Sequence, residues 1–324
     1  MKKYEAVVDR FLRYSGLVAF FVLWEAAPRL GWADPQFLPP LSAVLQSIYW
    51  LAVDGELYSH LIVSLWRALV GLMLAALVAL PLGFILGARC PETARHLDPL
   101  FRLLSQVNPF SLAPVFMLCF GIGEISKLMT IALVALWPIL FHTITGVRMV
   151  DPLLVKTARS LTVTRGVMVS EVLLPGAFPT IISGFRVATQ MTVFMLIAAE
   201  MLGAAAGLGW LVHNSAMLSQ IPRMYAGGAF IILLGIIINQ ILLKVERESM
   251  FWRECPGPVT DEVVRSLSGK TRSLYVAAFA CAFAFVLICG SQEVRRVNIQ
   301  GLHSDKTASH QHNHGGLVGP LRSD

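Results

Sequence analysis

The chain has 324 residues, of which 56% are hydrophobic and 14% charged, and its mean hydropathy is +0.66. A soluble domain carries about a quarter charged residues, and soluble cores stop growing near about 250–300 residues. The composition therefore excludes an ordinary soluble enzyme and a disordered protein. The five cysteines include no C-x-x-C pair, and their odd number does not indicate a disulfide framework.

Seven apolar windows are candidates for membrane-crossing helices, because a bilayer core of about 30 Å needs roughly 20 apolar residues. They cover residues 15–30, 61–87, 100–120, 127–147, 179–202, 225–243 and 274–290. The predicted fold is an all-α polytopic membrane protein with a six-helix core in residues 15–252 and a seventh, C-terminal transmembrane helix. Such a protein contacts membrane lipid over most of its surface.

The first window follows a basic segment, residues 1–14, and resembles a signal peptide. Glu25 interrupts its apolar run, and Pro28 follows Ala27 where a cleavage site is needed. A retained anchor is therefore the preferred interpretation. The N-terminal segment is then cytoplasmic.

Basic residues indicate the orientation, because Lys and Arg near helix ends stay on the cytoplasmic side. With the N-terminus inside, they gather in predicted inner segments, whereas residues 31–66 contain none. The net charge of +6 is thus a topology signal, and no nucleic-acid partner is expected.

Small residues four apart, at Gly83 and Gly87 and again at Gly203 and Gly207, are typical of closely packed membrane helices, although chance spacing is an alternative. Ionisable residues in predicted helices are few. Glu25, Glu200 and Arg186 are expected to reach the interface from helix ends, and Glu124 and Lys127, three residues apart, to pair.

Motifs for catalysis are missing: H-E-x-x-H, G-x-S-x-G and G-x-G-x-x-G do not occur. We therefore expect no catalytic residue and no cofactor bound by this chain. A buried series of Asp, Glu and His that would relay protons is also missing, which argues against a proton-coupled transporter.

Residues 151–174 are too polar to cross the membrane, and the topology places them inside. Leu153, Leu154, Thr157, Ala158 and Leu161 share one face at helical spacing, and Asp151-Pro152 is a typical helix start. The pattern predicts a short amphipathic helix between two transmembrane helices. It can act as a lever, or it can rest on lipid.

This segment resembles the cytoplasmic loop of the permease subunits of binding-protein-dependent ABC importers, E-A-A-x-x-x-G followed by I-x-L-P. Residues 156–162 align with the first half and residues 172–175 with the second. Lys156 stands where the family has glutamate, and Thr162 where it has glycine. Several further stretches resemble the branch for nitrate, aliphatic sulfonates, taurine, bicarbonate or thiamine-precursor pyrimidines: residues 39–44, 55–57 with 64–67 and Gly71, 81–83, 120–127, and 199–203 with 207–209.

The resemblance implies a bacterial inner-membrane permease for a small polar nutrient, such as an oxyanion, in residues 15–252. Its partners would be a second permease copy, in a homodimer or with a close homologue, cytosolic ABC ATPase subunits that bind ATP and Mg²⁺, and a periplasmic or lipid-anchored substrate-binding protein. The ATPase-coupling loop would comprise Val155, Lys156, Thr157, Ala158, Arg159, Ser160, Leu161, Thr162, Leu174 and Pro175. The alternative for this loop is a mere linker.

Polar residues within the apolar helices are candidates for the translocation path, although such residues as often hydrogen-bond between helices. The candidates are Asn108, Ser111, Thr143, Ser183, Thr189 and Gln190.

Beyond a polar linker, residues 253–273, the seventh window either crosses the membrane or forms a re-entrant or peripheral helix. The tail, residues 291–324, is too polar to fold. His310, His312 and His314 alternate along it and can converge on a divalent metal, or they belong to a solvated tail without a ligand.

Two other functions remain open from the sequence. A channel or passive facilitator would need no ATPase, and a metal-handling membrane protein would use the histidine tail as its active part.

Overall fold

The computed structural model describes residues 2–249, 284 and 286–297, and these contain helices but no strand. The helices are α1 (Lys2–Arg29), α2 (Leu41–Val53), α3 (Glu56–Phe84), α4 (Pro91–Ser105), α5 (Pro109–Phe120), α6 (Glu124–Arg148), α7 (Pro152–Ser160), α8 (Arg165–Val167), α9 (Leu174–Met201), α10 (Leu208–Met217) and α11 (Ile221–Ser249). Two π-helical segments, η1 (Ile85–Arg89) and η2 (Met168–Leu173), follow α3 and precede α9.

Within the described residues, four helical stretches are long and apolar enough to cross a membrane: Glu56–Arg89, Glu124–Arg148, Met168–Met201 and Ile221–Lys244. They contain or nearly coincide with the predicted windows 61–87, 127–147, 179–202 and 225–243. The all-α polytopic fold is therefore confirmed. The first window lies in α1, which is helical from residue 2 without a break at residue 14 and is not among these four stretches.

The prediction of one straight helix over residues 100–120 is wrong. The chain bends by 86° between α4 and α5, and this pair counts as one further span only if the two helices cross together. Asn108 has extended backbone and its side chain accepts a hydrogen bond from the amide of Phe110, so it caps a new helix. Pro109 supplies the first helical residue of α5 and has no amide hydrogen to continue α4.

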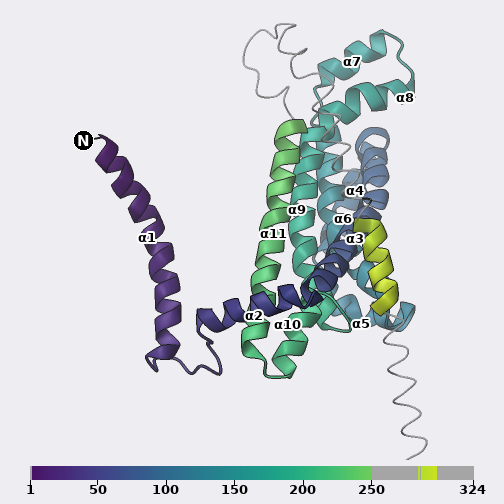
Figure 1. Ribbon diagram of the computed structural model, residues 1–324. Coiled ribbons are helices and arrows are strands. Elements are labelled where there is room, and N and C mark those ends of the chain that lie inside the picture. Colours follow the sequence, from purple (N-terminus) through teal and green to yellow (C-terminus); the bar gives the residue numbers. More distant parts are fainter. Residues whose placement is uncertain (1, 250–283, 285, 298–324) are drawn as a thin grey trace, which may run out of the picture.

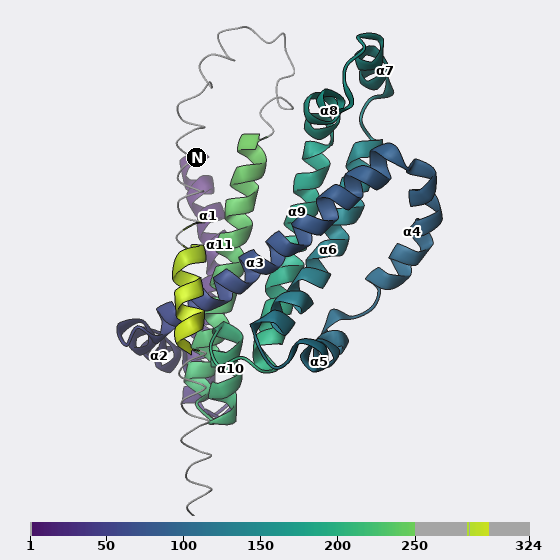
Figure 2. The same ribbon diagram turned by 90° about the vertical axis from the view of Figure 1, so that its right-hand side faces the viewer.

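Helix α6 is the centre of the bundle, with α9 and α3 packed on it, and α3 runs parallel to α6 along a close contact that we call the seam (Figure 2). Along α3 and η1 the small residues Gly71, Ala75, Ala79, Gly83 and Gly87 recur every four positions. A Cβ at Gly71, Gly83 or Gly87 would lie within 3.0 Å of Ile131, Thr143 or Val147 of α6, at a constant offset of 60 residues. Close packing of this kind is how membrane helices associate, since lipid offers no hydrophobic drive.

The Gly83 and Gly87 spacing therefore marks a helix contact, whereas Gly203 and Gly207 lie beyond the end of α9 and outside any helix. Antiparallel α9 packs on the other side of α6, with Gly184 against His142. Helices α7 and α8 lie at one end of the bundle, and α2, α5 and α10 at the other (Figure 1). From the positions of the basic residues we expect the first to be the inner, cytoplasmic end and the second the outer end, and the two ends are named in this sense below.

Two helices were not predicted: α2 and α10 are shorter than a membrane span and lie at the outer end. Helix α1 stands apart from the bundle over most of its length (Figure 1). Its C-terminal end is attached through the Trp24 indole, which donates to the carbonyl of Pro39 at 3.1 Å, and through Glu25, which accepts from the Ser42 amide and hydroxyl.

The C-terminal helix packs on the outer half of α3. A Cβ at Gly290 would lie 2.4 Å from Cβ of Trp66, and the Ser59 hydroxyl donates to Glu293 at 2.5 Å. The described helix continues to residue 297, so the predicted boundary between helix and tail at residue 290 falls inside it. Residues 253–283, most of the predicted seventh span among them, and His310, His312 and His314 lie outside the described residues.

These two contacts show that residues 290–297 run antiparallel to α3, toward the outer end. The test uses a variant of the protein in which its five native cysteines are replaced by serine. We predict that Arg296→Cys in this background, at an exposed position, reacts with a membrane-impermeant maleimide in spheroplasts. Arg159→Cys on α7 is the inner control and reacts only after permeabilisation. Labelling at position 296 that also requires permeabilisation would contradict the predicted direction.

Candidate functional site

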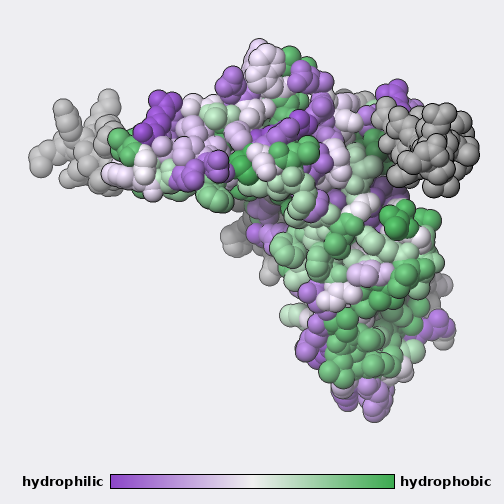
Figure 3. All heavy atoms as spheres, turned by 90° about the horizontal axis from the view of Figure 1, so that it is seen from below, coloured by the Kyte–Doolittle hydropathy of each residue, from purple (hydrophilic) through white to green (hydrophobic). Residues whose placement is uncertain are grey.

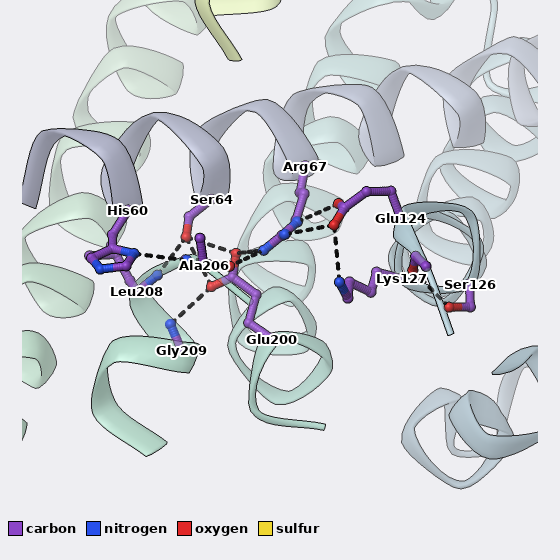
Figure 4. A network of polar contacts seen from close by, with 12 residues as sticks. His60, Ser64, Arg67, Glu124, Ser126, Lys127, Glu200, Ala206, Leu208 and Gly209 are labelled. Carbon is purple, nitrogen blue, oxygen red and sulfur yellow. Dashed lines mark hydrogen bonds and ion pairs between the residues drawn. The ribbon is translucent and has the colours of Figure 1, made fainter. Parts of the chain in front are cut away.

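A buried cluster of charged residues joins α3, α6 and α9 at the outer end (Figure 4). Arg67 of α3 has 1% of its side chain exposed and contacts two carboxylates. Its Nε and Nη2 donate to Glu124, the first residue of α6, at 2.7 and 2.8 Å. Its Nη1 donates to Glu200, near the end of α9, at 2.8 Å. One guanidinium thus joins the outer half of α3 to the start of α6 and the end of α9.

The charges of the cluster balance. Lys127, also buried, donates to Glu124 at 3.0 Å, so two cations face two carboxylates. A buried ion pair contributes little net stability against an apolar replacement, but removing one partner strands a charge and costs about 3–5 kcal/mol. The cluster therefore specifies how α3, α6 and α9 meet.

Hydrogen bonds extend the cluster to the segment between α9 and α10. Glu200 accepts from the Ser64 hydroxyl at 2.8 Å and from the Gly209 amide at 2.9 Å, and Arg67 donates to the carbonyl of Ala206 at 2.6 Å. Gly207 has a φ of +127°, and a Cβ there would lie 2.3 Å from Glu200 Oε1. Only glycine fits at this position.

Part of this cluster was predicted. The pairing of Glu124 with Lys127 is confirmed, but Glu200 does not reach the interface, because its side chain is 0% exposed and paired with Arg67. Arg67 was missed as a partner. Its signal is a single arginine inside the apolar window 61–87, where a charge requires an opposite charge nearby.

At the inner end, α7 spans Pro152–Ser160, as the pattern predicted. Asp151 caps it by accepting from the Leu153 amide at 2.8 Å. Val155 packs into an apolar cluster that includes Val147 of α6 and Leu173. The opposite side of the segment is open, with Leu153 and Leu161 exposed by 67% and 70%.

The remaining predicted coupling residues have distinct positions. Ala158 is buried, whereas Lys156, Thr157, Arg159 and Ser160 are exposed on α7. Leu174 and Pro175 form the start of α9 and are also exposed.

Thr162 has a φ of +51°, the left-handed conformation that suits glycine. The loop glycine of the family aligns with this position. The structure therefore needs a glycine-like backbone here although the side chain is β-branched. The cost for a residue with a Cβ is roughly 1–2 kcal/mol.

Of the candidate path residues, Asn108, Ser111 and Gln190 are exposed, and Gln190 donates to Asn239 of α11 at 3.4 Å. The hydroxyls of Thr143, Ser183 and Thr189 donate to carbonyls four residues earlier in their own helices.

Thr143 is 0% exposed and packs against Gly83 in the seam, and its assignment to the path stays a prediction. Among the described residues, no group of three or more His, Cys, Asp or Glu side chains could hold a metal ion.

We predict that Arg67→Met lowers the free energy of unfolding by about 3–5 kcal/mol, because it strands the buried Glu200 carboxylate. The double variant Arg67→Met with Glu200→Met leaves the balanced Glu124–Lys127 pair and is expected to lose less than the sum of the single variants. Denaturation of the full chain in detergent measures both.

Arg223→Met is the matched control, since Arg223 pairs with Glu56 at the outer end but is partly exposed. It is expected to cost less than about 1 kcal/mol. An Arg67→Met variant no less stable than this control would show that the cluster does not hold the helices together.

We further predict that Thr162→Gly slows amide hydrogen exchange at residues 161–163 by about two- to fivefold. Relief of left-handed strain outweighs the extra chain entropy of glycine by about 0.5–1 kcal/mol. Hydrogen-exchange mass spectrometry of the full chain reads this out locally. Thr162→Ala keeps a Cβ and is expected to show little change; equal slowing in both variants would contradict the strain.

The chain is similar to permease proteins of known transport systems. Residues 79–248 match the family model described as binding-protein-dependent transport system inner membrane component. The permease protein SsuC of Bacillus subtilis (strain 168), assigned to aliphatic sulfonate transport, is 31% identical over 231 residues, 71% of this chain and 83% of SsuC. The taurine transport system permease protein TauC of Escherichia coli (strain K12) is 31% identical, over 74% of this chain and 89% of TauC.

A similar fold occurs in a solved structure, a chain of the MetNI methionine ABC transporter in an inward-facing conformation. It is 17% identical, with a TM-score of 0.53 over 62% of this chain and 97% of that chain. The match of the family model over half of the chain, together with relatives above 30% identity, leads to one conclusion. The chain belongs to the family of inner-membrane permease components of binding-protein-dependent ABC importers, and it is a multi-pass inner-membrane protein.

Proposed function

We propose that this permease subunit works as one half of a pair that imports a small oxyanion, and that α7 with its flanking residues receives the movement of a cytosolic ATPase. Family membership makes the chain a transport subunit rather than an enzyme, with ATP hydrolysis on the partner ATPase. The observation that carries the proposal is the combination of an exposed apolar surface on α7 with an anchor, Val155, that packs against α6 and η2.

The coupling surface consists of residues 155–162 with Leu174 and Pro175, flanked by the exposed Leu153 and Leu154. Exposed leucines on a short cytoplasmic helix favour a protein partner that covers them. A push on α7 reaches α6 through Val155 and Val147, and α9 through Leu173. ATP binding can shift the bundle only if the ATPase has different affinities for its states.

A second permease copy is supported by surface that a single chain leaves uncovered. Viewed from the outer end, broad areas of the molecule are hydrophobic (Figure 3), and Leu118 and Ile122 are more than 80% exposed. Val18, Val22 and Leu23 of α1 are likewise exposed. Lipid covers part of such a surface, and a homodimer or a close homologue would cover the rest.

The substrate class rests on the relatives. SsuC is named for aliphatic sulfonates, TauC for taurine and CmpB of Synechococcus elongatus for bicarbonate. All of these carry a negatively charged oxygen group. A sulfonate is our first candidate, delivered by a periplasmic or lipid-anchored binding protein.

The coupling proposal predicts the outcome of co-purification from detergent. Leu161→Glu places a charge on the uncovered face of the segment, and it is expected to abolish both recovery of the co-expressed ATPase and uptake of labelled taurine or alkylsulfonate. Leu218→Glu makes the same change at an exposed position of the outer end and is expected to retain the ATPase. Undiminished recovery of the ATPase with Leu161→Glu would contradict the assignment.

A further inference from the structure

We infer that a cavity between α4 and α6 binds an oxyanion that carries a short apolar group. The cavity has a volume of about 400 Å³ and lies between α4 and the C-terminal third of α6. This volume is in the lower range of small-molecule sites. Its lining consists of Ala94, Arg95, Asp98, Phe101 and Arg102 from α4 and Phe141, Ile144, Thr145 and Arg148 from α6.

The lining has an excess of positive charge. Three guanidinium groups, those of Arg95, Arg102 and Arg148, share the cavity with one carboxylate, that of Asp98. Because these side chains are largely exposed, water screens their mutual repulsion, and the excess positive charge acts mainly by attracting an anion from solution. An arginine also offers a planar set of donors that matches the oxygens of a sulfonate or phosphate.

The protein contacts of these arginines leave donors for a ligand. Arg102 donates from Nε to Asp98 at 2.6 Å, Arg148 from Nη2 to the carbonyl of Pro91 at 3.0 Å, and Arg95 from Nη1 to Glu92 at 3.5 Å. Each guanidinium has five N–H donors. These three contacts therefore position the groups without exhausting them.

Topology alone does not explain this arrangement. Basic residues are expected near the inner ends of membrane helices, where they are normally directed toward water or lipid headgroups. Here Arg95 and Arg102 occupy one face of α4, and that face lines the same cavity as Arg148 of α6. Arg95 and Arg102 keep 76% and 68% of their side chains exposed, so the basic residues of the two helices meet at a cavity that is open to water.

The rest of the wall indicates which anion fits. Phe101, Phe141 and Ile144 line the cavity beside the arginines, and Arg102 lies 6.0 Å from the centre of the Phe141 ring. Trp137 stacks on Phe141 from α6 and stabilises the position of that ring. A bare inorganic anion would leave this apolar wall unused, whereas an alkylsulfonate or a phosphate ester contacts both parts.

Two sources supply such a group at the inner membrane face. One is a sulfonate leaving the translocation path. In that case the cavity is a site for the transported substrate, and the inference rests on the proposed function. The other is the headgroup of an anionic phospholipid, since basic pockets between membrane helices on this side bind such headgroups. Direct binding does not depend on the ATPase, so it is tested separately from transport.

The test uses the full-length chain in phosphatidylcholine nanodiscs, with hexanesulfonate as the probe and calorimetry as the measurement. We expect saturable binding that weakens roughly fivefold or more in Arg102→Gln and in Arg148→Gln. Arg89→Gln removes a charge at the same membrane face but outside the cavity, and it is expected to bind like the wild type. Hexanol, which has no charge, is expected not to bind.

Arg102→Lys and Arg148→Lys retain the charge and are expected to recover part of the affinity, which distinguishes loss of a ligand contact from misfolding. Absence of saturable hexanesulfonate binding, or equal affinity in the wild type and in both glutamine variants, would overturn the inference.

A second set of nanodiscs contains phosphatidylglycerol. If this lipid blocks hexanesulfonate binding to the wild type, the cavity is an oxyanion site occupied by lipid in the membrane; if it does not, the site is open to the solute. If the wild-type chain binds hexanesulfonate but does not support uptake of taurine or alkylsulfonate, the result counts against the proposed function alone.

Discussion

The structure depends on the position of one positive charge. Arg67 lies in the apolar part of α3, where an isolated guanidinium is costly, and two carboxylates from other helices accompany it. Because Glu124 begins α6 and Glu200 lies at the end of α9, the requirement for pairing aligns three helices at one depth in the membrane. The hydrogen bond that Glu200 accepts from the Gly209 amide then fixes the position of the segment that leads into α10.

Much of the fold could be predicted because crossing a membrane imposes a length and an apolar composition on each helix. Residues 61–87, 127–147, 179–202 and 225–243 carry that signal, although single charged residues such as Arg67 and Glu200 lie within it. The bend at Asn108 was missed because the apolar residues on both sides of it form a single window, and hydropathy does not register a helix cap. Helices α2 and α10 were missed because they are shorter than a span.

The site was harder to predict than the helices. A local pattern, Asp151-Pro152 before a helical face, located α7, and spacing alone related Glu124 to Lys127. The partnership of Arg67 with Glu124 and Glu200 joins residues 57 and 133 positions apart, and only the three-dimensional arrangement of the helices reveals it. Likewise, Thr162 could be aligned with a glycine, but its backbone angle could not be read from its identity.

The seam between α3 and α6 has a mechanical consequence. Along it, the backbone of α3 approaches side chains of α6 so closely that a single methyl group does not fit at Gly71, Gly83 or Gly87 without displacement. Sliding one helix past the other would drive bulky residues such as Ile131 into the neighbouring alanines. The two helices are therefore expected to move as one rigid unit. A tilt imposed near Val147 then also displaces the ends of α3 and α6 at the opposite membrane surface.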